Sequence, residues 1–127
     1  MRLALCLTLI ALPVLAEEVA VPSGQKVNFL EAIQNEAGPD GLTSRFRFVA
    51  PGIAEGGGVD FDTAATDMAF LCETYALPRI AVTGPRPVQV IISLSDRPVP
   101  FGQAAPDVTQ FFEAYRIDGA TCIWEAF

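Results

Sequence analysis

The stretch DFDTAATDMAFLCETYALP, residues 60–78, decides the fold class because it is the clearest helix in the chain. Its apolar side chains recur at helical spacing and share one face. The members of this face are Ala64, Met68, Leu71, Cys72 and Tyr75. Asp60 and the residues after it supply N-cap candidates, and the acids Asp60, Asp62 and Asp67 complement the positive end of the helix dipole. Pro78 lies just past the predicted end. The stretch therefore predicts one amphipathic helix with Cys72 on its buried face.

The sequence on the N-terminal side of this helix indicates strands. RFRF, residues 45–48, alternates polar and apolar side chains, which predicts a half-buried strand with the phenylalanines inward and the arginines outward. Residues 27–33 fit either a strand or a short helix, and we favour the strand. AGPDG, residues 37–41, predicts a turn between these two segments, and GGG, residues 56–58, predicts a flexible loop before the helix.

The sequence on the C-terminal side predicts a central strand and a hairpin. VQVIISLS, residues 88–95, is apolar on both faces, as a strand in the middle of a sheet would be. Asp118-Gly119 is a two-residue type I′ turn signal between two apolar segments. The strand pairs expected from this turn are Ile117–Ala120, Tyr115–Cys122, Glu113–Trp124 and Phe111–Ala126. All of these residues except Glu113 are apolar, so we expect this face of the hairpin to be buried and Cys122 to point to the core.

Together these elements predict an α+β fold. We expect about four to five mostly antiparallel strands, one main helix packed on one face of the sheet, and a C-terminal β-hairpin. The helix and the hairpin are each placed on the core by their own periodicity, so the two layers should meet at Cys72 and Cys122.

Residues 1–16, MRLALCLTLIALPVLA, have the order of a secretory signal peptide: Arg2, an apolar run, and the small residues Val14 and Ala16. We predict cleavage after Ala16, which leaves residues 17–127 as a single domain that is periplasmic or secreted and has no stable membrane anchor. The alternative is a retained N-terminal anchor, but the apolar run is shorter than the ~20 residues that a bilayer-spanning helix needs.

Cleavage changes the cysteine count, because it removes Cys6 and leaves Cys72 and Cys122. Two cysteines in an oxidising compartment most often form a disulfide, and we predict one between these residues. The alternatives are two buried free thiols, or a redox pair, which usually shows a Cys-x-x-Cys spacing that this chain lacks.

The composition excludes several classes of function. After residues 1–16 are removed, seven basic residues remain against fifteen acidic ones, a net charge of −8. Such a charge repels nucleic acids and anionic membrane surfaces. The chain contains no histidine, which excludes Ser-His-Asp and Cys-His nucleophile systems and zinc sites that depend on imidazole. We predict no metal site and no cofactor.

Two groups of side chains are candidates for a ligand or partner surface. The first group consists of Arg45, Arg47, Asp96 and Arg97. It could hold an anionic ligand by guanidinium contacts on the sheet face opposite the helix, or it could be an exposed strand face with modest ion pairs. The second group consists of Phe112, Ile123 and Phe127. These residues fall on the outer face of the hairpin, where they either form a partner surface or are covered by a second layer of the fold.

No motif assigns catalytic residues. Glu113 is an acid on an apolar face beside Trp124, an environment that can raise the proton affinity of a carboxylate. A carboxylate-dependent hydrolase would combine Glu113 with one of Asp96, Asp107 or Glu125. Asp60 and Asp62 resemble the start of a calcium loop, but the acidic residue at its twelfth position is missing, so we interpret them as helix-capping residues.

Four stretches, RFRFVAP, TDMAFLCETYALPRI, QVIISLSDRPVPFG and TQFFEAYRIDGATCIWEAF, resemble a family of small exported bacterial proteins of unknown function. The resemblance covers nearly all of residues 17–127. It implies a single-domain periplasmic protein of a Gram-negative bacterium, and it brings no activity, cofactor or catalytic residue with it. We therefore predict a non-enzymatic periplasmic binding or accessory domain with a protein partner; the alternative is the hydrolase without histidine.

Overall fold

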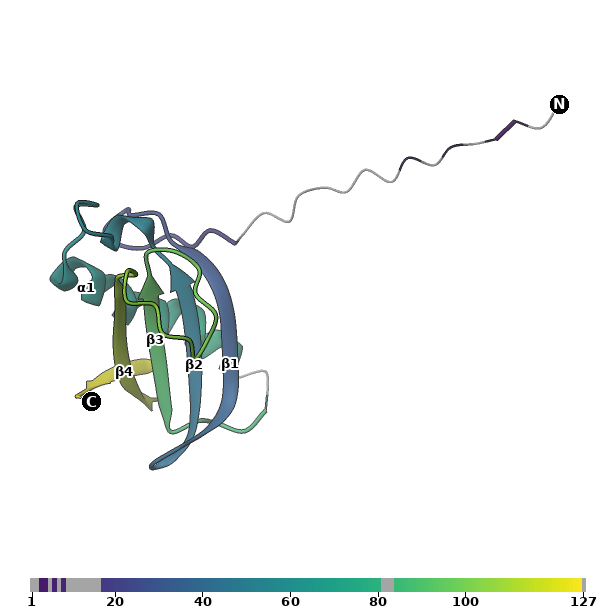
Figure 1. The fold of residues 1–127 in the computed structure, drawn as a ribbon. Coiled ribbons are helices and arrows are strands. Elements are labelled where there is room, and N and C mark those ends of the chain that lie inside the picture. The colour runs from purple at the N-terminus through teal and green to yellow at the C-terminus, as the bar shows by residue number, and fades with distance from the viewer. Residues whose placement is uncertain (1–2, 5, 7, 9–16, 81–83, 127) are drawn as a thin grey trace.

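The protein is built on one five-stranded mixed sheet, with the strands in the order β1-β2-β3-β4-β5 (Figure 1). The computed structural model describes residues 3, 4, 6, 8, 17–80 and 84–126. The strands are β1 (Asn28–Gly38), β2 (Gly41–Val49), β3 (Gln89–Ser95), β4 (Gln110–Asp118) and β5 (Thr121–Glu125). Only β2 and β3 pair in parallel, and the other three pairs are antiparallel. The predicted α+β fold is thus confirmed.

One helical segment packs on one face of this sheet. It consists of α1 (Phe61–Leu71), a π turn (Cys72–Ala76) and α2 (Leu77–Ile80), and a short 3-10 turn (Pro51–Ile53) precedes it. Asp60 caps α1 as predicted, since its carboxylate accepts a hydrogen bond from the Thr63 backbone N–H at 2.8 Å.

The prediction that the helix ends before Pro78 is wrong, because Pro78 lies inside α2. A proline ring within an α-helix collides with the carbonyl group one turn earlier. The π turn directly before α2 is wider than an α turn, which relieves this collision and lets the helical segment continue to Ile80.

The core lies between the helical segment and the sheet. All five residues of the predicted apolar helix face are buried there, and the phenylalanines of β2 point toward them. Tyr75 is the centre of the aromatic contacts, with ring centroids 5.0 Å from Phe29, 6.3 Å from Phe46 and 5.3 Å from Phe48. The prediction that the β2 phenylalanines face inward is therefore confirmed.

The remaining predicted strands are also present. Residues 28–33 of the favoured strand form the first part of β1, and the register shifts twice along its pairing with β2. The predicted turn joins β1 to β2, where Gly38 pairs with Gly41; Gly41 has a φ of 139°, a conformation that favours glycine. β3 is the middle strand of the five and is buried on both faces, as predicted.

The C-terminal hairpin is present, but its predicted strand pairs are wrong. Tyr115 pairs with Trp124, two positions beyond the predicted partner, so the turn residues are Gly119 and Ala120. A type I′ turn at Asp118-Gly119 requires positive φ at both central residues, whereas only Gly119 has one, at 60°. Glycine at the first central position is the preference of a type II′ turn. Because the partners move by two positions, each side chain keeps its predicted face. The prediction that this face is buried holds only in part, since Trp124 on the edge strand β5 is 62% exposed.

A disulfide joins Cys72 in the π turn to Cys122 in β5, with the two Cα atoms 6.2 Å apart. Beside it, the Glu73 carboxylate accepts a hydrogen bond from the Cys122 backbone N–H at 3.1 Å. These two contacts hold the π turn of the helical segment against the short edge strand of the sheet.

The long connection between β3 and β4, residues 96–109, crosses the sheet face that lies opposite α1 (Figure 1). Val99 is buried against this face, and its carbonyl oxygen accepts a hydrogen bond from the Arg47 guanidinium. The sheet is therefore covered on both sides, by helices on one and by a loop on the other.

The signal-peptide prediction falls mostly on residues outside the described part of the chain, as does Phe127. Among the described residues, no helix has both the length and the apolar character that crossing a bilayer requires.

Candidate functional site

The sheet face opposite α1, called here the outer face, carries most of the polar side chains of the central strands. Its position follows from the period of two, because residues between the buried core positions of each strand point the other way. The outer-face residues of β2, β3 and β4 include Thr43, Arg45, Arg47, Gln89, Ile91, Ser93, Ser95, Gln110, Phe112, Ala114 and Arg116. Three of the protein's arginines thus share one side of the sheet.

Arg47 makes hydrogen bonds within the protein that stabilise the fold. Its guanidinium donates to the Glu31 carboxylate on β1 and to the Val99 carbonyl oxygen in the β3–β4 connection. Only 9% of its side chain is exposed. The same guanidinium lies 5.7 Å from the centre of the Phe101 ring. Arg47 therefore fastens the connection to the outer face.

Arg45, next to Arg47 on this face, is bound much more loosely. Its closest carboxylate oxygen belongs to Glu36, and the 3.9 Å between them is too long for a hydrogen bond. Its buried Nε has no hydrogen-bond partner among the described residues. A buried donor without an acceptor costs roughly 1–3 kcal/mol of stability. Arg45 Cζ lies 5.2 Å from the centre of the Phe101 ring, within the range of a cation–π contact.

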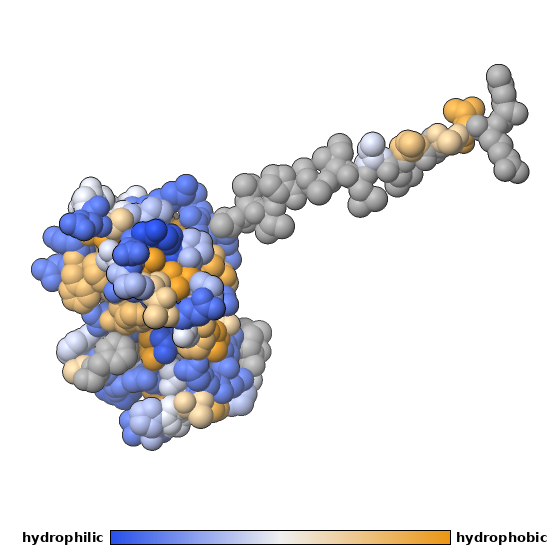
Figure 2. Space-filling view, in the orientation of Figure 1, coloured by the Kyte–Doolittle hydropathy of each residue, from blue (hydrophilic) through white to orange (hydrophobic). Residues whose placement is uncertain are grey.

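A cavity of about 210 Å³ opens beside this guanidinium, and we call it the Arg45 cavity. Its side-chain lining combines two arginines, two amides and two aromatic rings: Arg45, Arg47, Gln103, Gln110, Phe101 and Phe112. Both rings are about half exposed, at 48% for Phe101 and 43% for Phe112. In the space-filling view of this side, apolar side chains lie between hydrophilic ones where the connection crosses the sheet (Figure 2).

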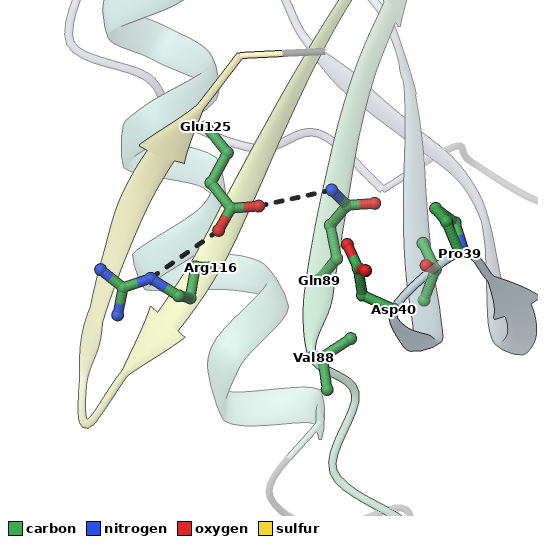
Figure 3. Close-up of a pocket in the computed structure, with 7 residues that line it drawn as sticks. Pro39, Asp40, Val88, Gln89, Arg116 and Glu125 are labelled. Atoms are coloured by element: carbon green, nitrogen blue, oxygen red, sulfur yellow. Dashed lines mark hydrogen bonds and ion pairs between the residues drawn. The ribbon is translucent and has the colours of Figure 1, made fainter.

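A second cavity of about 170 Å³, the Arg116 cavity, lies at the end of the outer face near the β1–β2 turn (Figure 3). Arg116 and Glu125 point toward each other from β4 and β5, with 3.7 Å between Nε and Oε1. Gln89 Nε2 lies 3.5 Å from the other Glu125 oxygen, and Asp40 and Thr43 complete the polar lining. Like Arg45, the Arg116 guanidinium faces a carboxylate of its own chain beyond hydrogen-bond distance, but its side chain is 54% exposed, against 18% for Arg45.

The structure brings part of the predicted surface together. Arg45, Arg47 and Phe112 line one cavity, and Ile123 lies on the same face, paired with Arg116. Whether these residues bind a ligand stays a prediction.

Asp96 and Arg97, predicted to join the same cluster, lie elsewhere and line neither of the two cavities. Arg97 Nε donates to Asp96 Oδ1 at 2.9 Å, and the Thr109 N–H donates to Asp96 Oδ2 at 3.1 Å. These two hydrogen bonds, that from Arg97 first, hold the pKa of Asp96 below its ordinary value. Arg97 also donates to the Asp107 carbonyl oxygen. Asp96 follows β3 directly, so the pair ties the two ends of the β3–β4 connection together.

Glu113 lies on the helix-facing side of the sheet, where it is 8% exposed and accepts a hydrogen bond from Trp124 Nε1. Burial, and next to it the Glu113 charge, raise the pKa of Tyr115 well above its ordinary value. Glu125 pairs with Ala114 and therefore lies on the outer face. The acids of the hydrolase hypothesis thus lie on opposite faces, with Asp96 at the base of the loop, and no shared acid pair forms between Glu113 and Glu125.

The described residues contain no group of three or more His, Cys, Asp or Glu side chains that could hold a metal ion. Asp60 is the first acid of the pattern that resembles a calcium loop, and its carboxylate caps α1 instead. The hydrogen bond from the Thr63 backbone N–H lowers the pKa of Asp60 from its ordinary value.

Sequence reasoning missed several residues of both cavities. Gln89, Gln110 and Arg116 lie on strands, so the period of two could have placed them on the outer face. Phe101 and Gln103 lie in the β3–β4 connection, which has no periodicity, and nothing in the sequence indicates that it folds back over the sheet.

The fold and the site define a small α+β domain with one mixed sheet, one helical layer, one disulfide and a polar outer face crossed by a loop. The chain belongs to a family of unknown function (DUF6497), whose model matches residues 6–127. No curated protein and no solved structure matches the chain.

Proposed function

We propose that this protein is an exported, non-enzymatic binding or accessory domain of the periplasm, and that it contacts a protein partner through its outer face. The observation that carries the proposal is Arg45, a mostly buried guanidinium with unused donors at a cavity between two exposed phenylalanines. Such a combination of an arginine and aromatic rings is typical of the centre of a protein interface.

Export is supported by the contacts of Glu17, the first residue after the proposed cleavage site. Its carbonyl oxygen accepts a hydrogen bond from the Phe29 N–H at 2.8 Å. Its carboxylate accepts one from the Tyr75 hydroxyl at 2.9 Å and pairs with Arg79 at 3.3 Å. Cleavage after Ala16 would leave all of these contacts in place. The disulfide is a second support, because such bonds persist in oxidising compartments.

Intact mass spectrometry of the protein recovered from the periplasm of a Gram-negative host tests the export step. The expected mass is that of residues 17–127, and it should increase by two hydrogen masses on reduction. A mass that includes residues 1–16, or free thiols in the folded protein, would contradict this part of the proposal.

Site-specific photocrosslinking in the native periplasm tests the binding step. A crosslinking amino acid at Phe112 on the outer face should form an adduct with one defined protein. The matched control replaces Phe70, which is 38% exposed on the helical side, and should not form that adduct. The same adduct from both positions, or none from Phe112, would overturn the choice of the outer face.

A further inference from the structure

We infer that the Arg45 cavity is a carboxylate-binding site that takes a monoanion carried on an apolar group, such as the C-terminal carboxylate of a partner polypeptide that ends in an apolar residue. This inference rests on the proposed function and adds the chemical class of the ligand group.

The first argument is the unequal use of the two neighbouring arginines. Arg47 has a carboxylate and a carbonyl oxygen as acceptors, while the Arg45 Nε has none among the described residues and its Glu36 contact is 3.9 Å long. Phe101 packs against Arg45 and restricts where its planar group can lie. Because the Nε is buried, a ligand would reach this guanidinium through its Nη groups, which make no hydrogen bond to Glu36 at 3.9 Å. A guanidinium that is positioned in advance and keeps unpaired Nη donors is suited to a planar, two-oxygen acceptor.

The second argument is the size of the cavity. At about 210 Å³ it is smaller than the pockets of roughly 300–1,000 Å³ that enclose whole drug-sized ligands. It therefore suits one functional group and the few atoms next to it, as the end of a chain would present them. The amides of Gln103 and Gln110 line the same space and can donate further hydrogen bonds to an oxygen.

The third argument is charge. Residues 17–127 carry a net charge of −8, which works against polyanions such as nucleic acids or multiply phosphorylated groups. The cavity offers a single guanidinium with free donors, which matches a single negative charge. The exposed rings of Phe101 and Phe112 at its rim match an apolar group beside that charge.

NMR titration of the oxidised protein made from residues 17–127 tests the site, with the Arg Nε–Hε and Gln side-chain signals as the readout. The probes are acetyl-Ala-Phe with a free carboxylate, the same peptide with a C-terminal amide, and phenylacetate. The free acid should shift the Arg45 Nε–Hε and Gln110 signals in a saturable way. The amide should bind about tenfold more weakly or not at all.

Arg45→Lys keeps the charge but loses the planar fork, so it should weaken binding of the acid by about tenfold. The matched control is Arg116→Lys, on the same face but outside the Arg45 cavity, and it should bind as the unchanged protein does. Binding of phenylacetate as tight as that of the peptide would point to a free small carboxylate as the source of the group.

Three results would overturn the inference: equal shifts from the acid and the amide, no saturable shift at Arg45, or an equal loss of binding in the two lysine variants. Crosslinking at Phe112 is independent of these results. If the adduct forms while the titration fails, the outer face still binds a partner and only the carboxylate chemistry is wrong.

Discussion

The two faces of the sheet differ in the kind of side chain that they carry. The helix-facing side buries aromatic and aliphatic side chains around Tyr75 and is linked to the helical layer by a disulfide. The outer face carries three arginines, two exposed phenylalanines and cavities that include those beside Arg45 and Arg116. Both faces arise from the same strands, because neighbouring residues point to opposite sides. The difference separates the face that stabilises the fold from the face that is proposed to bind a partner.

This separation has one expected exception, since Arg47 belongs to the outer face but is as well bonded as a core residue. Loss of the disulfide or of the Asp67 carboxylate on the helix side should lower the free energy of unfolding strongly, loss of the Arg47 guanidinium should have an intermediate effect, and loss of the Arg45 guanidinium should have a weak one. The predictions below test this order.

Removing the disulfide by the double substitution Cys72→Ser and Cys122→Ser should have the largest effect. The bridge spans 50 residues of sequence, and closing a loop of this length in the unfolded chain is worth about 4 kcal/mol in the chain-entropy model. Urea denaturation followed by circular dichroism measures the loss. Wild-type protein unfolded in the presence of a reductant is the matched control and should show the same decrease. A decrease of less than about 1 kcal/mol in the free energy of unfolding would mean that the disulfide contributes little to the stability of the helix-facing side.

Asp67→Ala should have the next largest effect. This α1 side chain is fully buried and accepts hydrogen bonds from the Ser23 N–H, the Ser23 hydroxyl and the Gln25 amide. Its loss leaves these donors without their acceptor, at a cost of roughly 2–3 kcal/mol in the free energy of unfolding. Asp67→Asn keeps one acceptor oxygen and should lose less. Equal stability of the alanine variant and the wild type would show that the turn at residues 21–25 contributes nothing.

Asp67 also illustrates what the sequence could not predict. Its place near the start of a helix suggested a role in the helix dipole, whereas its carboxylate binds a turn 44 residues earlier in the chain. Local patterns predict local structure, so the helix, its cap, the strand alternation and the central strand were all found. Partners far apart in sequence leave no such pattern.

The outer face shows the same limit at the candidate site. Arg45, Arg47 and Phe112 could be assigned to it because strand periodicity fixes the direction of a side chain. The cavity also needs Phe101, whose position depends on how the β3–β4 connection folds over the sheet. The position of the hairpin turn was predicted wrongly for a related reason. Asp118-Gly119 and Gly119-Ala120 both suit a tight turn, and only the pairing with β3 and the packing of the core select between them.

Arg47→Met should cost about 1–2 kcal/mol, an intermediate effect, because it leaves the Val99 carbonyl oxygen and the Glu31 carboxylate without their donor. The methionine keeps most of the length of the side chain. Hydrogen exchange should also show faster exchange in the β3–β4 connection, while the helical segment keeps its protection. Unchanged exchange in residues 96–109 would contradict the role of Arg47 in holding the connection.

Tyr75→Phe should cost about 1 kcal/mol at neutral pH through the loss of one hydrogen bond to Glu17. Burial, and then the bond to Glu17, raise the pKa of Tyr75 to about 12 in the folded protein, above the ordinary value of 10.0. The unfolded state therefore releases this proton first, so wild-type stability should fall as the pH rises from 10 to 12. The phenylalanine variant should show a shallower decline over that range in urea titrations, with the remainder due to other groups such as Tyr115. Parallel declines in both proteins would contradict the assignment to Tyr75.

Arg45→Met should have the smallest effect, within about 0.5 kcal/mol of the wild type. The substitution gives up a 3.9 Å contact with Glu36, but it also removes a buried Nε that has no acceptor among the described residues. These two changes oppose each other, so the free energy of unfolding should hardly move, while Arg47→Met, two positions along the same strand, lowers it clearly. A loss above about 1 kcal/mol in Arg45→Met would show that this guanidinium stabilises the fold. The N–H donors of Arg45 would then stabilise the fold as those of Arg47 do. The two arginines would no longer differ, and the binding proposal depends on that difference.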